Sequence, residues 1–398
     1  MNPIKSKLSS SSLFYYKKEN ISLRIHEKLK NRKNKSISSE RKISPENKKK
    51  YSKNILFRKR QTNSIDHIND SIIKRKINSN KSINNIKYYL YENLVSSLPF
   101  YYLNFDDLKY NLNDIIYFSE YSTLYKGKYF HNVVCIKEIK NFINLPEIEQ
   151  DKIKNEIDIS IKLHHKHIIN TLGYSFNQKK TKIFIISEYM KNKSLKYFIE
   201  SNKGNISLKR KLSFVYEISL AIEYMHTRNY KILHRDIKSS NILLDDNYHC
   251  KLCDFGMSKY YTNDKGLKLN IDGSNSNNNM NTNYQTNSQS TLFWMSPEYL
   301  CEGIINEKSD IYSFGILIWE IFMEDTNPYK NININDYLLG NKEIVCNKRP
   351  IINEDNFKEC PKIKELIILM WNNDYNKRPD IGYILNLLED LNNQYSFL

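Results

Sequence analysis

The spacing of hydrophobic and polar residues becomes regular from about residue 104 onward. Apolar and polar residues alternate in 132–139 (NVVCIKEI), and another apolar run bounded by polar residues lies at 181–190 (TKIFIISEYM), as expected for β-strands. In other segments the apolar residues recur every three or four positions, the spacing of one helix face. The segments with this helical spacing are 147–165, 208–228, 308–323, 363–371 and 381–391. A strand-rich first part and a helical second part predict an α+β fold with two lobes.

The predicted helix at 308–323 (KSDIYSFGILIWEIFM) is apolar nearly all round, which indicates a helix buried in the core. No run of 18 apolar residues occurs in the chain, so we expect no membrane-spanning helix. The N-terminus lacks the apolar stretch of a secretory signal, and the six cysteines show no disulfide framework. These features predict an intracellular protein, cytoplasmic or alternatively nuclear.

Charge is distributed very unevenly along the chain. Residues 1–100 hold 24 Lys and Arg against 7 Asp and Glu, whereas residues 101–398 hold 37 of each. The net charge of +17 therefore lies in the first hundred residues, which are also rich in Ser and Asn. We expect 1–100 to be a disordered, basic, low-complexity segment. It could contact polyanions, with binding that weakens as salt rises, act as a nuclear signal, or simply remain solvated.

The strongest chemical signal is HRDIKSSN (234–241) followed by DFG (254–256). Phosphoryl transfer needs a group that receives the hydroxyl proton, cations near the phosphates and oxygen ligands for Mg²⁺. Asp236 is placed to act as the base, and Lys238 can reach the transferred phosphate. Asn241 and Asp254 offer the hard oxygen ligands that a magnesium ion prefers.

These motifs and their spacing resemble those of the protein kinase superfamily. VCIK (134–137) is similar to the strand motif whose lysine binds the α- and β-phosphates of ATP, which makes Lys137 that lysine and places Cys135 above the adenine. Glu156 lies eight residues before HH, as does the helix glutamate that pairs with this lysine in the family. Without that resemblance, Glu156 could equally be part of a solvated helix face.

SEYMKNKSL (187–195) resembles the hinge that binds adenine. The resemblance implies that Ser187 is the gatekeeper and that the backbone groups of Glu188 and Met190 face the ring. It also implies further nucleotide contacts from Ile116, Leu124 and Leu243. The motifs run from about 116 to 380 and imply a kinase domain at 104–396, with an N-lobe at 104–190 and a C-lobe at 191–396. An Asn- and Ser-rich tract at 263–289 is predicted to be an unstructured insertion between DFG and the next motif.

Two further motifs imply structural contacts in the C-lobe. TLFWMSPEYL (291–300) resembles the segment that ends in Ala-Pro-Glu, and its Glu298 should pair with Arg378 of NKRPD. Asp310 in SDIYSFG should hold the loop that carries Asp236. Both are expected to be buried structural residues and not catalytic ones.

Lys238 in the HRD motif and Thr291 before FWMSPE favour transfer to serine or threonine. The chain resembles the tyrosine-kinase-like group most, which implies MgATP as phosphate donor and proteins as acceptors. Arg235 suggests control by phosphorylation between DFG and SPE, because arginine binds phosphate well. The candidate acceptors are Thr262, Thr286, Ser288 and Ser290. The sequence indicates no particular substrate or oligomeric state.

The chain departs from the family pattern in the phosphate-binding loop. Aligning LYKG (124–127) with the family places Tyr117, Ser119 and Ser122 at three positions that are usually glycine. Glycine allows unusual backbone angles and lets amides approach phosphate closely, so we expect weaker phosphate binding here. Two residues expected in an apolar stack between the Glu156 helix and Phe255 are also polar, namely Ser160 and Thr171.

These departures leave two alternatives, an active kinase and a pseudokinase or scaffold with weakened nucleotide binding. Loss of a catalytic charge is typical of the second class. Here the charged and polar groups all remain, namely Lys137, Glu156, Asp236, Asn241 and Asp254. An active kinase is therefore the favoured interpretation.

Overall fold

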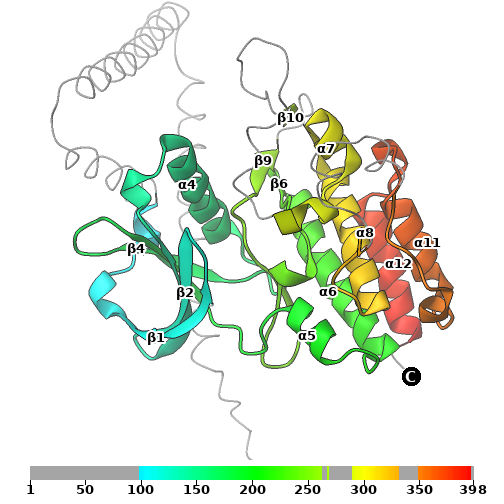
Figure 1. The fold of residues 1–398 in the computed structure, drawn as a ribbon, viewed down its shortest axis with the longest axis horizontal. Helices are drawn as coiled ribbons and strands as arrows, with labels where there is room; N and C mark the ends of the chain where they lie inside the picture. Colours follow the sequence, from blue (N-terminus) through cyan, green and yellow to red (C-terminus); the bar gives the residue numbers. More distant parts are fainter. Residues whose placement is uncertain (1–97, 262–266, 269–288, 331–347, 396–398) are drawn as a thin grey trace, which may run out of the picture. The chain divides into compact units, whose positions relative to one another are not determined.

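The computed structural model describes residues 98–261, 267–268, 289–330 and 348–395. The described chain forms an N-lobe built on a β-sheet and a C-lobe built of helices, as the sequence predicts (Figure 1). The basic segment 1–97 lies outside the described residues, so its contact with polyanions stays a prediction. No helix among the described residues is long and apolar enough to cross a membrane.

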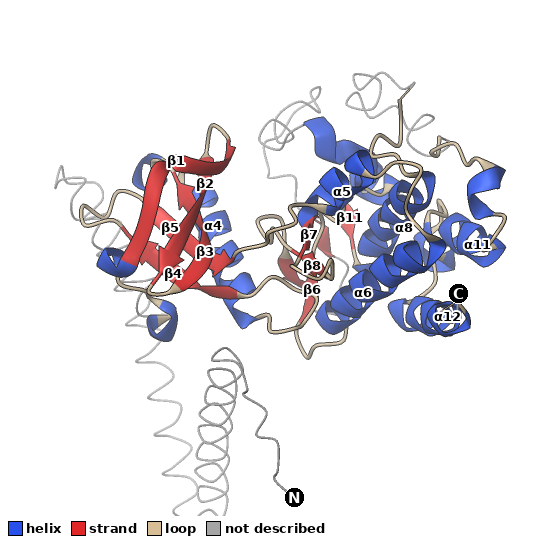
Figure 2. Cartoon of the chain, turned by 90° about the horizontal axis from the view of Figure 1, so that it is seen from below, coloured by secondary structure: helices blue, strands red, loops and turns tan. Residues whose placement is uncertain are grey.

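The N-lobe sheet has five antiparallel strands in the order β1-β2-β3-β5-β4. The strands are β1 (Leu108–Phe118), β2 (Ser122–Tyr129), β3 (Asn132–Ile139), β4 (Thr171–Phe176) and β5 (Ile183–Glu188). Helix α4 (Glu147–Lys162) covers one face of this sheet (Figure 2). The predicted strand at 132–139 is confirmed at both ends. Its alternation buries Val134 and Ile136 and turns Cys135 and Lys137 to the opposite face.

The packed part of the N-lobe begins earlier than the sequence predicts. Leu98 is buried in the same cluster as Ile157 and Tyr174, and its carbonyl accepts a hydrogen bond from the Tyr174 hydroxyl. Leu103 then donates its amide to the Tyr174 carbonyl at 2.8 Å. Chain packed against the N-lobe is therefore present from Leu98, six residues before the predicted start at 104, because Leu98 supplies apolar surface that the N-lobe buries.

The C-lobe is built around helix α8 (Glu307–Met323). Every residue from Ser309 to Phe322 is buried, which confirms the predicted core helix. A capping box starts this helix. The Asn306 side chain accepts from the backbone at Ser309, and the Ser309 side chain accepts from the backbone at Asn306. The other helices in the described part of the C-lobe are α5 (Leu195–Ser201), α6 (Leu208–His226), α7 (Pro297–Glu302), α11 (Pro361–Met370) and α12 (Ile381–Gln394).

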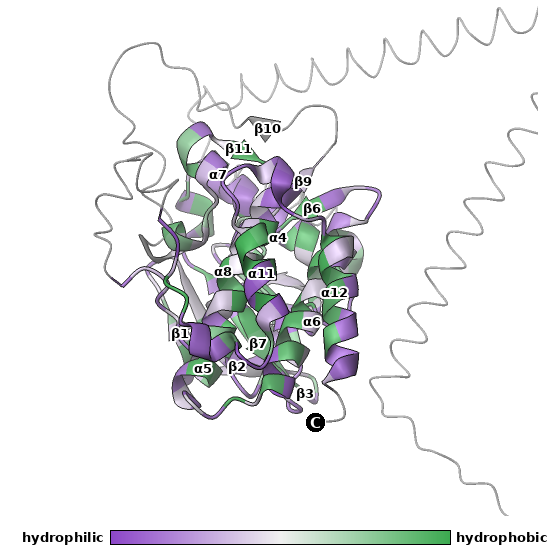
Figure 3. Cartoon of the chain, turned by 90° about the vertical axis from the view of Figure 1, so that its right-hand side faces the viewer, coloured by the Kyte–Doolittle hydropathy of each residue, from purple (hydrophilic) through white to green (hydrophobic). Residues whose placement is uncertain are grey.

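Helix α12 illustrates how the outer helices pack on this core. It carries hydrophobic and hydrophilic residues together (Figure 3). Its buried residues recur at helical spacing and are Ile381, Ile384, Leu388 and Leu391. One face of the helix is therefore turned to the core and the other to solvent.

Two predicted helices end earlier than expected. Helix α4 ends at Lys162 and not at 165, because Leu163 already has an extended backbone. Helix α6 ends at His226 and not at 228, and the Thr227 hydroxyl donates to the Glu223 carbonyl at 2.8 Å. Such ends depend on local capping more than on apolar spacing.

Short strands and single turns connect the helices of the C-lobe. Among the residues that the structure describes there, the strands form three antiparallel pairs, which are β6 (Lys231–Leu233) with β9 (Lys259–Tyr261), β7 (Ile242–Leu244) with β8 (Cys250–Leu252), and β10 (Leu267–Lys268) with β11 (Ile304–Ile305). The 3₁₀ turns of the described chain are Pro99–Tyr101, Phe105–Asp107, Phe142–Asn144, Ser239–Asn241, Gln289–Trp294, Glu354–Phe357 and Tyr375–Lys377.

The pair β10–β11 corrects one prediction. The tract 263–289 was expected to be unstructured throughout, yet residues 267–268 pair with 304–305. Backbone hydrogen bonding to a neighbouring strand organises these two residues despite the polar composition around them. The positions 262–266 and 269–288 lie outside the described residues.

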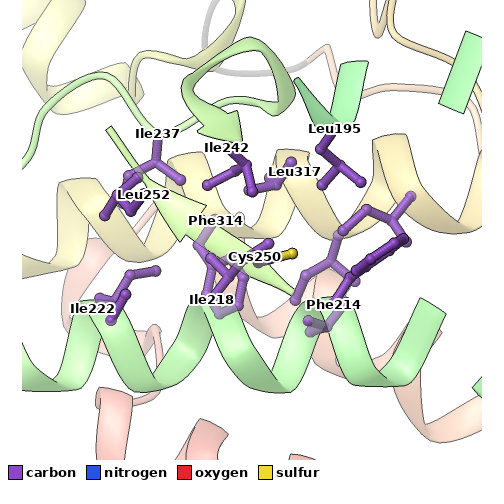
Figure 4. Close-up of a cluster of buried hydrophobic side chains, with 14 of the residues drawn as sticks. Leu195, Phe214, Ile218, Ile222, Ile237, Ile242, Cys250, Leu252, Phe314 and Leu317 are labelled. Carbon is purple, nitrogen blue, oxygen red and sulfur yellow. The ribbon is translucent and has the colours of Figure 1, made fainter. Parts of the chain in front are cut away.

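The loop that carries the HRD motif rests on the C-lobe core. Figure 4 shows Ile237, within that loop, and Ile242, at the start of β7, with Ile218 of α6 and Phe314 of α8 in one buried cluster. All four side chains are at most 1% exposed. Close packing of this kind leaves the loop little freedom to shift, which positions the polar residues 238–241 between them.

Candidate active site

The structure brings Lys137 of β3 and Glu156 of α4 together, as the sequence predicts. Their Nζ and Oε1 atoms lie 2.6 Å apart, and the Nζ atom is also 3.8 Å from Oδ1 of Asp254. Alternation along β3 turns Lys137 away from the face that buries Val134 and Ile136, and Glu156 reaches Lys137 from the second half of α4. One lysine from the N-lobe thus joins two carboxylates from different elements.

Burial and charge act differently on the pKa of each of these three groups. Burial would lower the pKa of Lys137, but Glu156 and Asp254 raise it above its ordinary value. Lys137 in turn lowers the pKa of Asp254. Burial raises the pKa of Glu156, an effect that Lys137 opposes. Near neutral pH the site therefore holds a cationic lysine beside an anionic Asp254.

Asp254 has a left-handed backbone with φ of 66°, which is uncommon for a residue other than glycine. Next to it, Phe255 is buried and its ring meets that of His234 edge to face, with centroids 5.2 Å apart. A Cβ on Gly256 would lie 3.3 Å from Asp254 Oδ1 and 3.5 Å from Glu156 Oε2. Because residue 256 is glycine, the carboxylates of Asp254 and Glu156 can both lie close to its backbone.

The loop after β6 places the other predicted residues together. Asp236 is buried, and its Oδ1 lies 3.0 Å from the Nζ of Lys238. Asn241 donates from Nδ2 to the backbone oxygen and to Oδ2 of Asp236, both at 2.8 Å. These bonds fix the Asp236 carboxylate and leave the amide oxygen of Asn241 as the atom that can face a cation.

Asp310 supports this loop from helix α8, which confirms the prediction. It is fully buried and accepts from the amides of His234 and Arg235 at 2.8 Å each. The Nε2 atom of His226 lies 2.9 Å from the same carboxylate. Burial opposes ionisation, but the hydrogen bonds and charge of His226 lower the pKa of Asp310 below its ordinary value. Arg235 is held with φ of 69° by these contacts.

A second buried carboxylate under the loop was not predicted. Glu320 of α8 accepts from the Ser239 amide at 3.1 Å, the Ser239 hydroxyl at 2.5 Å and Nε1 of Trp294 at 3.0 Å. Burial raises its pKa to about 7, against the effect of these hydrogen bonds. A single carboxylate within the apolar run LIWEIF (317–322) was the sequence signal that could have revealed it.

The two residues that suggested serine or threonine transfer are in direct contact. Lys238 Nζ donates to the Thr291 hydroxyl at 2.8 Å while it lies beside Asp236. Thr291 is buried. The segment before α7 is therefore attached to the loop that carries Asp236.

The loop between β1 and β2 closes on itself without glycine. The Ser119 amide donates to the Ser122 carbonyl at 2.9 Å, and the Ser122 amide donates to the Ser119 hydroxyl at 3.1 Å. Lys140 donates from Nζ to the Ser119 carbonyl at 2.7 Å and lies over the Phe118 ring. No residue from 117 to 122 has a positive φ, so none of them needs the freedom of glycine. In this conformation the amides of both serines are engaged inside the turn.

The residues expected near adenine line up across the sheet. Leu124 pairs with Lys137, and Cys135 pairs with Ser187. Ile116 is exposed, Met190 is buried, and Leu243 is half-buried on β7. The Glu188 side chain accepts from the Asn170 amide and from Lys251 Nζ, each at 2.7 Å. The Glu188 side chain is thus engaged by Asn170 and Lys251, and only the backbone of Glu188 is expected to face adenine.

The site also fits a divalent cation with few protein ligands. Asn241 and Asp254 offer an amide oxygen and a carboxylate, the hard donors that Mg²⁺ takes beside phosphate oxygens and waters. Among the described residues no cluster of three His, Cys, Asp or Glu side chains could hold a metal by itself. The donor set therefore fits an ion that shares its coordination with a phosphate.

Other predicted positions behave as follows. Glu298 and Arg378 form the expected buried ion pair, with Nη1–Oε1 at 2.9 Å and Nη2–Oε2 at 2.8 Å. Ser160 and Thr171 are both buried, at 4% and 5% exposure. The Ser160 hydroxyl bonds the Ile157 carbonyl of its own helix at 3.2 Å. Thr262, Thr286 and Ser288 lie outside the described residues, and so does the side chain of Ser290.

A two-lobed fold with these residues at the junction of the lobes defines the class of protein kinases. A family model described as protein tyrosine and serine/threonine kinase matches residues 112–388, so the chain belongs to this family. Membership implies use of ATP and of a divalent metal ion in general, and protein substrates.

Curated relatives give the same family. A dual specificity protein kinase, shkA of Dictyostelium discoideum, is 29% identical over 68% of this chain and 47% of its own. The serine/threonine-protein kinase STY46 of Arabidopsis thaliana is 27% identical over 68% and 42%. The serine/threonine-protein kinase CTR1 of the same plant is 28% identical over 71% and 31%. The chain thus spans less than half the length of each of these relatives.

Proposed function

We propose that this protein is a serine/threonine kinase that transfers the γ-phosphate of MgATP to hydroxyl groups of proteins. The contact of Lys238 with both Asp236 and Thr291 is the observation that carries the proposal. It places a cation between the expected base and a hydroxyl of the segment before α7. Two of the relatives named above, STY46 and CTR1, are named as serine/threonine-protein kinases, which agrees with this proposal.

The residues divide the chemistry among them. Asp236 would accept the proton of the attacking hydroxyl, and the charge of Lys238 would stabilise negative charge on the transferred group. Lys137, oriented by Glu156 at 2.6 Å, would bind the remaining phosphates. Asn241 and Asp254 would hold Mg²⁺, which when bound neutralises phosphate charge. The backbone of Glu188 and Met190, with Ile116, Leu124, Cys135, Ser187 and Leu243, would bind the nucleoside.

We also propose control by phosphorylation of the segment between DFG and SPE. Arg235 carries a buried Nε atom without a hydrogen-bond partner among the described residues, while its Nη2 donates to the Tyr299 hydroxyl at 3.1 Å. Burial and the charge of Arg235 lower the pKa of Lys259. Arg235 and Lys259 are thus two cations that a phosphate could bind, and the Nε of Arg235 is a donor without a described partner.

Phosphate transfer by the purified full-length chain tests the function. With radiolabelled MgATP and a general protein substrate, we expect phosphoserine and phosphothreonine in excess over phosphotyrosine. Lys137→Met serves as the inactive control, since it removes the cation that lies 2.6 Å from Glu156. Transfer no greater than that of the control, in Mg²⁺ and in Mn²⁺, would reject the enzyme. Thermal stabilisation by nucleotide would then separate a nucleotide-binding pseudokinase from one that binds none.

The closed loop leads to a prediction for Ser119. Ser119→Gly removes the hydroxyl that accepts from the Ser122 amide and allows the backbone to approach phosphate, so the KM for ATP should fall a few-fold. Ser119→Ala is the matched control, because it removes the hydroxyl but keeps the Cβ. Steady-state kinetics at varied ATP measure both. An unchanged or lower kcat/KM for ATP in Ser119→Gly would mean that this loop does not limit ATP use.

A further inference from the structure

Two side-chain hydrogen bonds connect helix α4 to strand β9 and to Ser258, the residue before it. Asn155 donates from Nδ2 to the Ser258 carbonyl at 2.7 Å, and the Tyr260 hydroxyl donates to Oδ2 of Asp158 at 2.9 Å. Asn155 directly precedes Glu156 in the helix. The contacts therefore join the helix that carries Glu156 to the segment that follows the DFG motif. We call these four residues, Asn155, Asp158, Ser258 and Tyr260, the α4–β9 latch.

The Asp158 end of the latch is reinforced by charge. Lys162, one turn farther along α4, lies 2.6 Å from Oδ1 of Asp158, and its Nζ is 5.6 Å from the centre of the Tyr260 ring. Burial and the bond to Asp158 raise the pKa of Tyr260 above its ordinary value. The Tyr260 hydroxyl therefore keeps its proton and acts as a donor at neutral pH.

On its other side the latch reaches the loop of Asp236. Strand β9 pairs with β6, with Tyr260 opposite Ile232, and β6 leads directly into His234. The Ser258 hydroxyl also donates to the His234 carbonyl at 3.3 Å. A continuous set of hydrogen bonds thus runs from the Glu156 helix to the HRD motif without passing through the side chain of Phe255.

Helix α4 buries a polar residue, Ser160, among its apolar residues. Ile157, Ile159 and Ile161 are fully buried, but the residue between the last two is Ser160, which is also buried and bonds its own helix backbone. A buried serine contributes far less apolar area than a leucine or isoleucine. Hydrogen bonds on another side of the helix can offset that deficit.

We propose that the α4–β9 latch holds helix α4 in the position where Glu156 meets Lys137, which makes Asn155, Asp158 and Tyr260 positioning residues of this kinase. The proposal rests on the kinase function proposed above, because it concerns the same site. None of the three touches Lys137 or Asp236 in the contacts described, so each acts through the helix.

Single substitutions in the full-length chain test the latch. Tyr260→Phe removes one hydrogen bond to a charged group, so kcat/KM for ATP should fall about tenfold, with most of the change in KM. Asn155→Ala should act in the same direction. Tyr261→Phe is the matched control on the same strand and should remain within about twofold of the natural protein.

A second pair of variants separates the hydrogen bond from general packing. Asp158→Asn keeps an oxygen that accepts from Tyr260 and should remain within about threefold of the natural protein. Asp158→Leu keeps similar size without an acceptor and should fall about tenfold. Equal losses in the two variants would overturn the proposal, because they would point to the charge of Asp158 and not to its bond with Tyr260.

Amide hydrogen exchange gives a readout that does not depend on activity. Without nucleotide, the amides of residues 150–162 should exchange faster in Tyr260→Phe and Asn155→Ala than in Tyr261→Phe. Equal exchange in all three would overturn the latch even if the enzyme is active. If the natural chain transfers no phosphate, the proposed function fails, and the exchange comparison alone still decides whether the latch holds α4.

Discussion

Replacing Asp236 with asparagine is expected to lower kcat by about 10²–10⁴, the contribution of a positioned general base. Asparagine has nearly the same size but does not accept a proton from a hydroxyl at neutral pH. Asn241 bonds Oδ2 of Asp236 at 2.8 Å and Lys238 lies 3.0 Å from Oδ1, so the single amide oxygen of asparagine can keep one of these two contacts. The bond from Asn241 to the backbone oxygen of residue 236 does not depend on the side chain. The fold around the site should therefore persist, and the loss should fall on chemistry.

The division of the loss between kcat and KM checks this interpretation. Asp236 lies in the C-lobe loop, away from the Lys137–Glu156 pair, so the KM for ATP and thermal stabilisation by ATP should change little. Asp246→Asn, an exposed aspartate ten residues farther on, is the matched control and should keep full activity. Retention of more than a tenth of kcat in Asp236→Asn would show that another group receives the proton.

Breaking the buried ion pair between Arg378 and Glu298 should give the largest loss of stability. Arg378→Met leaves Glu298 buried with the Ser309 hydroxyl, at 3.0 Å, as its remaining described partner. Leaving one charge of a buried pair uncompensated costs about 3–5 kcal/mol. A domain is usually stable by only about 5–15 kcal/mol, so the free energy of unfolding should fall by a large fraction.

Thermal unfolding of the full-length chain without nucleotide measures this loss. For a domain of roughly 300 residues, the unfolding entropy corresponds to about 1.6 °C per kcal/mol, so Tm should fall by roughly 5–8 °C. Lys364→Met breaks an exposed pair with Glu354, and it should change the free energy of unfolding by less than about 1 kcal/mol. The double variant Arg378→Met with Glu298→Leu should be more stable than Arg378→Met alone, since it removes the unpaired charge. A double variant that is less stable would contradict this electrostatic explanation.

Much of the site could be predicted from local patterns. Strand β3 follows from alternation alone, and the contacts Lys137–Glu156 and Glu298–Arg378 follow from motifs whose spacing resembles that of a known family. Each of these motifs is a short stretch with characteristic chemistry. The structure then places them together as the resemblance implies.

Contacts without such a motif were not predictable in the same way. Asn155 and Ser258 are 103 residues apart, and neither apolar spacing nor composition links them. Leu98 is buried only because the sheet folds over it, and residues 267–268 form a strand only because 304–305 lie beside them. The closed turn of Ser119 and Ser122 likewise depends on backbone angles that a missing glycine does not reveal. Tertiary context decides such features.

The two halves of the site rest on different cores, and this separation has a consequence for how the sequence can vary. Lys137 stands on a strand whose Val134 and Ile136 belong to one buried cluster, whereas Ile237, beside Asp236, belongs to another. Five departures from the family pattern lie in the N-lobe, at positions 117, 119, 122, 160 and 171, whereas in the C-lobe Ser296 replaces the alanine of Ala-Pro-Glu and no catalytic group is changed. A substitution that alters one core need not disturb the other. The N-lobe can therefore diverge in how it holds the nucleotide while the C-lobe keeps its catalytic groups unchanged.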